Sequence, residues 1–142
     1  MNEKRVIRKA ALLVFKDNEI MLARSKKNAE VFYMLGGKFE PGESDEECLR
    51  REVKEEIGCD ILPRSLTFLH EFSAVPHGKG KEDVLLVERV YKGEIIGTPV
   101  PQSEIEEVRY YGTSIDQKHL TPMSEKIFAW LMEAGLLVTP QK

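Results

Sequence analysis

One short segment, residues 44–58, constrains the fold of this chain most, because it carries the signals for both ends of an amphipathic helix. Ser44 is a candidate N-cap, and Glu47 three residues later completes the capping-box pattern. Gly58 stands where such a helix would end. The apolar residues between these signals repeat every four positions: Leu49, Val53 and Ile57. The pattern predicts a helix over residues 44–57 that packs its apolar stripe on a sheet.

The same helix carries three acidic side chains close together, Glu52, Glu55 and Glu56. At about 100° per residue, they fall within an arc of roughly 100° beside the apolar stripe. Clustered carboxylates repel one another, and partial burial increases that cost. A hard divalent cation with oxygen ligands, Mg²⁺ or Mn²⁺, would remove both penalties. Taken alone, the cluster is also explained by a solvated acidic face balanced by nearby Lys and Arg side chains.

These acids belong to a longer pattern that resembles the Nudix box, the signature of hydrolases that act on nucleoside diphosphates linked to another moiety. All seven polar and glycine positions of that signature match: Gly37, Glu43, Arg51, Glu52, Glu55, Glu56 and Gly58. Val53 fills its apolar position, whereas Cys59 replaces the usual larger aliphatic residue. So many fixed matches are rare by chance at average residue frequencies. The chain is therefore identified as similar to the Nudix hydrolases.

The resemblance implies a fold, an extent and a reaction. The implied fold class is α/β, a Nudix-type α/β/α sandwich with a mixed β-sheet. It would form one domain over residues 1–142, with the box at residues 37–59. The implied reaction is hydrolysis of a phosphorus-containing acid anhydride by attack of water at phosphorus, with Mg²⁺ or Mn²⁺ as the cofactor.

The resemblance also implies roles for the box residues. The expected metal ligands are the Gly36 carbonyl and the carboxylates of Glu52, Glu55 and Glu56. Glycine suits this carbonyl because no side chain blocks the approach of the backbone to an ion. One carboxylate would act as the base, which is Glu52 in several members. Glu43 and Arg51 are expected to pair and so to orient the helix, which completes the expected catalytic set of Glu43, Arg51, Glu52 and Glu55.

Three further residues outside the helix are candidates for the site. A further acid often binds metal or acts as base in this family, and Glu107 is the best match, with Glu104 and Glu106 as competitors. A solvated turn before a strand explains these acids equally well. Arg24 and Lys38 are expected to contact substrate phosphates, although each is also explained as a surface charge.

The rest of the chain reads as strands with one further helix. Strands are expected at residues 6–15, 20–24, 31–35, 61–74, 83–91 and 108–111, and the third of these is expected to stop at the glycine pair 36–37. Residues 76–81 read as a loop, and residues 124–134 as an amphipathic helix. Strands with two helices among them predict a mixed sheet that is covered on both faces.

Composition bounds the class of protein. A chain of 142 residues is long enough for one domain with its own core, and its net charge of −3 does not favour binding to a nucleic-acid polymer. Cys48 and Cys59 are expected to be free, buried thiols. The sequence has neither an apolar run of about 18 residues nor a signal-peptide pattern, which predicts a cytoplasmic protein without membrane contact.

The substrate is the least determined feature. The small MutT-like branch of the family is the closest pattern, which implies a small nucleotide substrate, a nucleoside triphosphate cleaved to the monophosphate and pyrophosphate. Many relatives form homodimers, so the resemblance allows a homodimer here, although no sequence feature marks an interface. Leu35 and Met123–Ser124 depart from the members that clear oxidised guanine nucleotides, which carry Pro and Asn there. Pro76 favours the alternative, an ADP-ribose or nucleotide-sugar pyrophosphatase. A nucleotide-sensing module without turnover is the third hypothesis.

Overall fold

The computed structural model describes residues 5–76, 80 and 83–140. Its main element is a seven-stranded mixed sheet in the order β2-β3-β4-β1-β7-β6, with β9 paired to β3. The strands are β1 (Arg5–Leu13), β2 (Phe15–Lys16), β3 (Glu19–Ser25), β4 (Tyr33–Lys38), β6 (Thr67–Ala74), β7 (Val84–Lys92) and β9 (Ile105–Tyr111). Only β1 and β7 run parallel among these described strands. A separate ribbon pairs β5 (Asp60–Ile61) with β8 (Ile95–Ile96).

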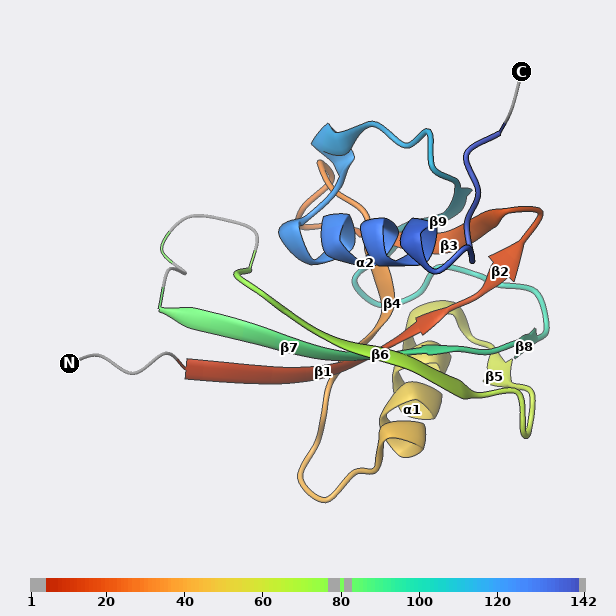
Figure 1. Cartoon of the computed structure of the whole chain (residues 1–142). Coiled ribbons are helices and arrows are strands. Elements are labelled where there is room, and N and C mark those ends of the chain that lie inside the picture. The colour runs from red at the N-terminus through yellow and green to blue at the C-terminus, as the bar shows by residue number, and fades with distance from the viewer. Residues whose placement is uncertain (1–4, 77–79, 81–82, 141–142) are drawn as a thin grey trace.

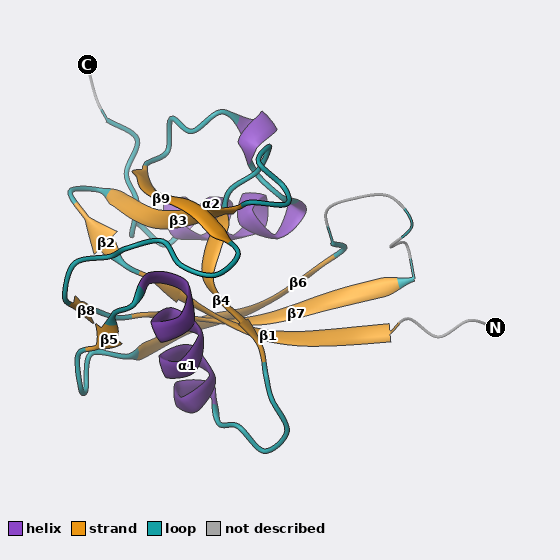
Figure 2. Cartoon of the chain, turned by 180° about the vertical axis from the view of Figure 1, so that it is seen from behind, coloured by secondary structure: helices purple, strands orange, loops and turns teal. Residues whose placement is uncertain are grey.

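Two helices cover opposite faces of the sheet, α1 (Asp45–Ile57) and α2 (Pro122–Glu133), as Figures 1 and 2 show. The central strand β1 supplies both cores, because successive strand side chains point to opposite faces. Ala10 and Leu12 pack with α1, whereas Ala11 and Leu13 pack with α2. This arrangement is the α/β/α sandwich with a mixed sheet, so the predicted fold class is confirmed.

Helix α1 begins and ends where its local signals predict. The Ser44 hydroxyl accepts a hydrogen bond from the Glu47 N–H (3.2 Å), and the Glu47 carboxylate accepts one from the Ser44 N–H (2.9 Å). Gly58 ends the helix with φ at 70°, a left-handed conformation that glycine adopts without steric cost. The predicted helix is confirmed.

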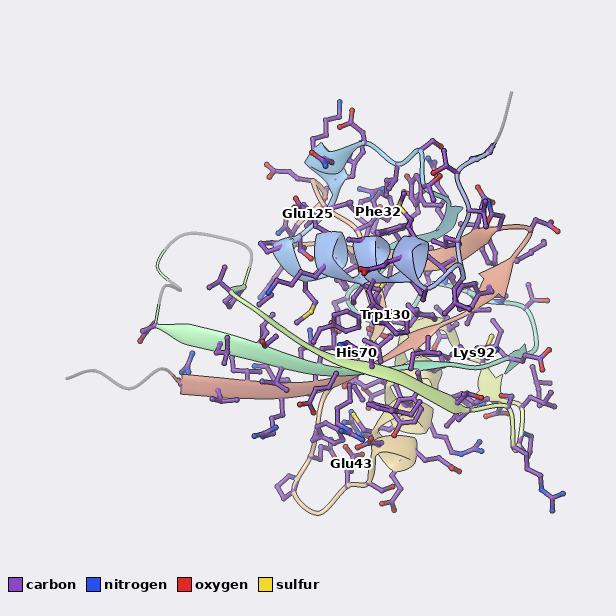
Figure 3. The ribbon with its side chains drawn as sticks, viewed as in Figure 1. Phe32, Glu43, His70, Lys92, Glu125 and Trp130 are labelled. Atoms are coloured by element: carbon purple, nitrogen blue, oxygen red, sulfur yellow. The ribbon has the colours of Figure 1, made fainter. Side chains whose placement is uncertain are left out.

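Helix α2 starts two residues earlier than the predicted residue 124. Its N-cap is Thr121, whose hydroxyl accepts a hydrogen bond from the Ser124 N–H (3.1 Å), and Pro122 occupies the first turn, where its missing N–H costs nothing. Along the helix, Trp130 stacks on His70 of β6 with ring centroids 5.2 Å apart, and Figure 3 shows the two side chains together. This stack ties α2 to the sheet.

Strand β4 corrects the prediction that its apolar run stops at the glycine pair. The strand continues through both glycines to Lys38, because Gly36 and Gly37 pair with Ala11 and Ala10 of β1. The first residues of β4 pair instead with β3. One strand therefore links the two parts of the sheet, and the glycines lie at the point where it does so.

Several other boundaries differ from the predictions. The strand expected over residues 61–74 is interrupted by a turn at Pro63–Arg64, where Arg64 has a φ of 68°. The last strand begins at Ile105 instead of Val108, because it pairs along β3. The loop predicted at residues 76–81 lies mostly outside the described residues.

Cys48 and Cys59 are buried and form no disulfide, as predicted. Burial raises the pKa of the Cys48 thiol to about 11, so this group stays protonated near neutral pH. Among the described residues, no helix is long and apolar enough to cross a membrane.

Candidate active site

An open cleft of about 480 Å³ lies where α1, β4 and the start of α2 meet. Its lining comes from segments far apart in the sequence, and its charged members are Lys9, Lys38, Glu52, Glu56, Glu88 and Glu104. Four carboxylates thus face two ammonium groups. Such a cleft favours a ligand that brings cations or hydrogen-bond donors to the acidic groups.

Glu56 is the most buried acid of α1 at the cleft. Its side chain is only 3% exposed, and its carboxylate accepts a hydrogen bond from the Gly36 N–H at 2.9 Å. Burial raises the pKa of Glu56 to about 8, and the charges of Glu52 and Glu104 add to the shift, while the Gly36 N–H and Lys9 oppose it. The group therefore sits where a nearby positive charge would stabilise its ionised form.

Glu52 lies one helical turn before Glu56 and packs under β4. A Cβ atom at Gly37 would come within 2.5 Å of the Glu52 carboxylate, so only glycine allows this close approach. Gly36 is constrained more strongly, because its φ is 131° and a Cβ atom placed there would lie only 2.0 Å from the Ala10 carbonyl oxygen of the backbone. Burial raises the pKa of Glu52, although its ion pair with Arg51 (2.9 Å) counteracts this.

The third acid of the helix, Glu55, points elsewhere. Its side chain is 53% exposed and lies 3.4 Å from the Arg51 guanidinium, outside the lining of the cleft. Glu52 and Glu56 are four residues apart and share a helix face, whereas Glu55 is rotated by about 100° from Glu56. The structure therefore brings two of the three acids together in the cleft.

Arg51 holds together the acidic segment beside the cleft. Its guanidinium donates to both carboxylate oxygens of Glu43, at 2.6 and 2.9 Å, and to the Lys38 carbonyl at 2.9 Å. Glu43 lies at the foot of α1 in Figure 3. These hydrogen bonds from Arg51 lower the pKa of Glu43 to about 2, and the carboxylates in turn raise the pKa of Arg51. The expected Glu43–Arg51 pair is present and ties α1 to the end of β4.

The candidates outside the box are divided by the structure. Lys38 lines the cleft, as expected for a group that contacts substrate. Arg24 instead donates to Glu107 at 2.8 Å, and neither residue is part of the lining. The acid of this segment that does line the cleft is Glu104, one of the two competitors. A register shift between β3 and β9 separates it from Glu107.

Two charged residues of the lining had no signal in the sequence, Lys9 of β1 and Glu88 of β7. They stand opposite each other in the parallel pairing of the two strands. Such a pair is invisible in the sequence because nothing local relates residue 9 to residue 88.

A divalent cation suits the oxygen atoms on one side of this cleft. The carboxylates of Glu52 and Glu56 and the carbonyl of Gly36 are hard ligands, and the two carboxylates have lost most of their hydration. Within the described residues, no three His, Cys, Asp or Glu side chains converge enough to hold a metal ion by themselves. The set therefore fits an ion that keeps water or substrate oxygens as further ligands, as Mg²⁺ does.

Known proteins resemble this chain throughout the described fold. The model of the NUDIX domain matches residues 6–131. NAD-capped RNA hydrolase NudC from Stutzerimonas stutzeri (strain A1501) is 37% identical over 127 residues, which cover 88% of this chain and 42% of that protein. The chain thus spans about two-fifths of the length of the curated relatives it matches.

Solved structures share the fold at lower identity. A MutT protein from Methanosarcina mazei Go1 has a TM-score of 0.75 at 21% identity, covering 95% of this chain and 99% of that one. An ADP-ribose pyrophosphatase from Streptococcus suis 89-1591 has a TM-score of 0.62 at 19% identity, covering 95% and 96%. Because the NUDIX domain match extends over most of its length, this chain belongs to the Nudix hydrolase family.

Proposed function

We propose that this protein hydrolyses the pyrophosphate bond of a nucleoside diphosphate that is linked to another group. The observation that carries the proposal is the placement of Glu52 and Glu56. Both carboxylates lie in an open cleft against the side-chain-free backbone of Gly36 and Gly37. The first substrate class we propose is a nucleoside triphosphate, cleaved to the monophosphate and pyrophosphate, with residues 1–142 acting as one domain.

In the reaction, the oxygen of water forms a bond to one phosphorus atom while the bridging P–O bond breaks. A carboxylate takes the proton of the attacking water, and the leaving phosphate departs with the electron pair of the broken bond. Glu52 is the proposed base, because its carboxylate lines the cleft and is more exposed than that of Glu56, which lets it reach a water molecule. Glu104 is the alternative base at the other wall of the cleft.

Glu56, Glu52 and the Gly36 carbonyl are the proposed holders of Mg²⁺, with Mn²⁺ as a substitute. Glu55 joins them in this proposal by turning away from Arg51, which its exposure permits. When bound, such an ion neutralises the diphosphate and lowers the pKa of water. The protein's own contribution is to keep these oxygens fixed, through the Arg51 network and the capped helix.

Lys38 and Arg24 are proposed to serve substrate binding in different ways. Lys38 lines the cleft and would place its ammonium beside a phosphate. Arg24 is held by Glu107 and would reach a phosphate only after leaving that partner. Glu107 as a metal ligand would need the same release, so Glu104 is the stronger candidate for the further acid.

A second substrate class has its own support. The curated relatives are named NAD-capped RNA hydrolases, which favours a substrate with a dinucleotide pyrophosphate bridge. The same name means that an RNA substrate stays open for this chain, although the net charge does not favour a nucleic-acid polymer. ADP-ribose has the same bridge. Homodimer formation stays a prediction as well.

A substrate panel with Mg²⁺ tests the proposal. It contains all ribo- and deoxyribonucleoside triphosphates, 8-oxo-dGTP, ADP-ribose, NADH, a diadenosine polyphosphate and an NAD-capped RNA, with Glu56→Gln as the blank. Pyrophosphate released from a triphosphate supports the first class. Turnover of only the bridged dinucleotides or ADP-ribose moves the protein to the second. Saturable binding without any turnover would support a sensing module and contradict the enzyme.

A further inference from the structure

Glu88 is a buried carboxylate that the proposed hydrolysis does not use. It is 7% exposed, and it has no hydrogen-bond or ion-pair partner within the described part of the chain, although it lines the cleft. Its oxygens can meet solvent only through the cleft, and a largely desolvated carboxylate is stabilised when a ligand there supplies N–H or O–H donors. The position of Glu88 therefore points to a ligand group that donates hydrogen bonds.

Lys9 limits the choice of that group. It stands opposite Glu88 in the β1–β7 pairing and lines the same cleft, and Figures 1 and 2 show the two strands side by side. The subsite thus offers the acceptor carboxylate of Glu88 beside the ammonium of Lys9, and Lys38 pairs with Lys9 on the other side, away from Glu88. A phosphate would be repelled by Glu88, and a second metal ion would be repelled by Lys9. A neutral group that both donates and accepts hydrogen bonds satisfies the two residues together.

The neighbourhood of the subsite indicates which part of a nucleotide it meets. Lys9 and Glu88 line the same cleft as Glu52 and Glu56, so the subsite adjoins the proposed diphosphate site. In a nucleotide, the ribose is the group attached directly to the reacting phosphates. Its vicinal hydroxyls offer two donors to one carboxylate, while their oxygens accept from an ammonium. Acidic side chains bind ribose hydroxyls in the same way in dinucleotide-binding folds.

We propose that Glu88, with Lys9 beside it, binds the vicinal hydroxyls of the substrate ribose and makes this protein select ribonucleotides over 2′-deoxyribonucleotides. Glu88 is then a specificity-determining residue of the cleft. The inference rests on the proposed function for the location of the diphosphate, but it concerns binding and does not require turnover.

Equilibrium binding of products tests the subsite without hydrolysis. The probes are the four ribonucleoside monophosphates and their 2′-deoxy counterparts, measured by calorimetry with the full chain. For the parent protein, we expect the ribo form of at least one base to bind roughly tenfold more tightly or better, the value of hydrogen bonds to a charged group. Glu88→Gln should remove that preference, and Glu19→Gln, on β3 and outside the lining, should keep it.

Each outcome decides the matter. Equal binding of ribo and deoxy forms, or no binding of either, overturns the assignment. Glu88→Gln could instead change the discrimination between GMP and IMP and leave the preference for ribose over deoxyribose unchanged. This result would show that Glu88 contacts the base, and it would overturn the assignment to the ribose. If Glu88→Gln does not fold, Glu88→Asp, which keeps the charge but shortens the reach, should weaken the ribo form selectively.

The two proposals can fail separately. A clear ribose preference in binding, without turnover of any compound in the panel, refutes the hydrolase and keeps the subsite. Turnover at equal kcat/KM on ribo and deoxy substrates, unchanged in Glu88→Gln, keeps the hydrolase and refutes the subsite.

Discussion

Two acidic segments of this molecule, α1 and the approach to β9, reach the same cleft by different physical rules. On α1, Glu52 and Glu56 share a face because they are four residues apart on a helix. In the second segment, Glu104 lines the cleft while Glu107, three residues later, binds Arg24. A register shift against β3, between Ile105 and Glu107, separates these two acids. Helical spacing is local, whereas strand register depends on a distant partner.

The largest effect is expected on α1. Glu56→Gln should lower turnover by about 10³-fold, because it removes a buried charged ligand of the proposed metal, while the Gln oxygen can still accept from the Gly36 N–H. Glu55→Gln should lower turnover less, by about 10²-fold, because Glu55 contacts Arg51 in this structure and must turn away from it to reach the metal. Steady-state rates with Mg²⁺ check this, with circular dichroism as the control for folding. Full activity of folded Glu56→Gln would exclude the proposed metal role.

Matched variants of the three acids before and within β9 test which of them acts in the cleft. Glu104→Gln is expected to reduce kcat by about 10²-fold, whereas Glu106→Gln, which lies outside the lining of the cleft, should stay near the parent value. Glu107→Gln should act mainly on KM, because it releases Arg24. A larger loss of kcat in Glu107→Gln than in Glu104→Gln would mean that the strand register changes when substrate binds.

The pKa of Glu56 predicts a pH dependence of stability. In the folded protein this pKa is about 8, above its ordinary value of 4.5, so the folded state holds the proton more tightly. The contribution of this carboxyl to stability is fully present below pH 4.5 and is lost as pH rises to about 8. Without metal, Glu56→Gln should therefore be more stable than the parent at pH 9, by up to roughly 5 kcal/mol, and the difference should vanish below about pH 4.5. Urea unfolding at both pH values measures it.

The smallest effect tests what joins α1 to the cleft. Arg51→Ala should lower kcat about tenfold and Tm by about 5 °C, because it breaks the link from Glu43 to the Lys38 carbonyl. Arg50→Ala, on the same helix, removes only an exposed pair with Glu46 and a bond to the Ile61 carbonyl, and should cost less. Thermal melts and rates of both variants measured side by side provide the check. An unchanged Tm in Arg51→Ala would count against the structural role of the pair.

The features that could be predicted from the sequence are those that depend on local contacts, and the features that could not depend on a distant strand. The helix over residues 44–57, its caps and the Glu43–Arg51 pair depend on contacts within a few turns of chain, so the pattern was sufficient. The predicted end of strand β4 before Gly36 and Gly37 was wrong. Glycine disfavours strands locally, and only the pairing with β1 keeps these two residues in the strand. The separation of Glu104 from Glu107 also depends on a distant strand.

The sequence by itself determined the α/β/α class, the capped acidic helix and the family, because periodicity, caps and the spacing of the box residues are all encoded within short segments. Only the tertiary structure decided which acids meet in the cleft. It selected Glu104 and placed Lys9 beside Glu88 through the parallel pairing of β1 and β7, whereas the contact between Glu55 and Arg51 is a local pair four residues apart on one helix. The physical reason is that strand pairing and burial join residues with no local relation, and burial then changes the charge properties of each carboxylate.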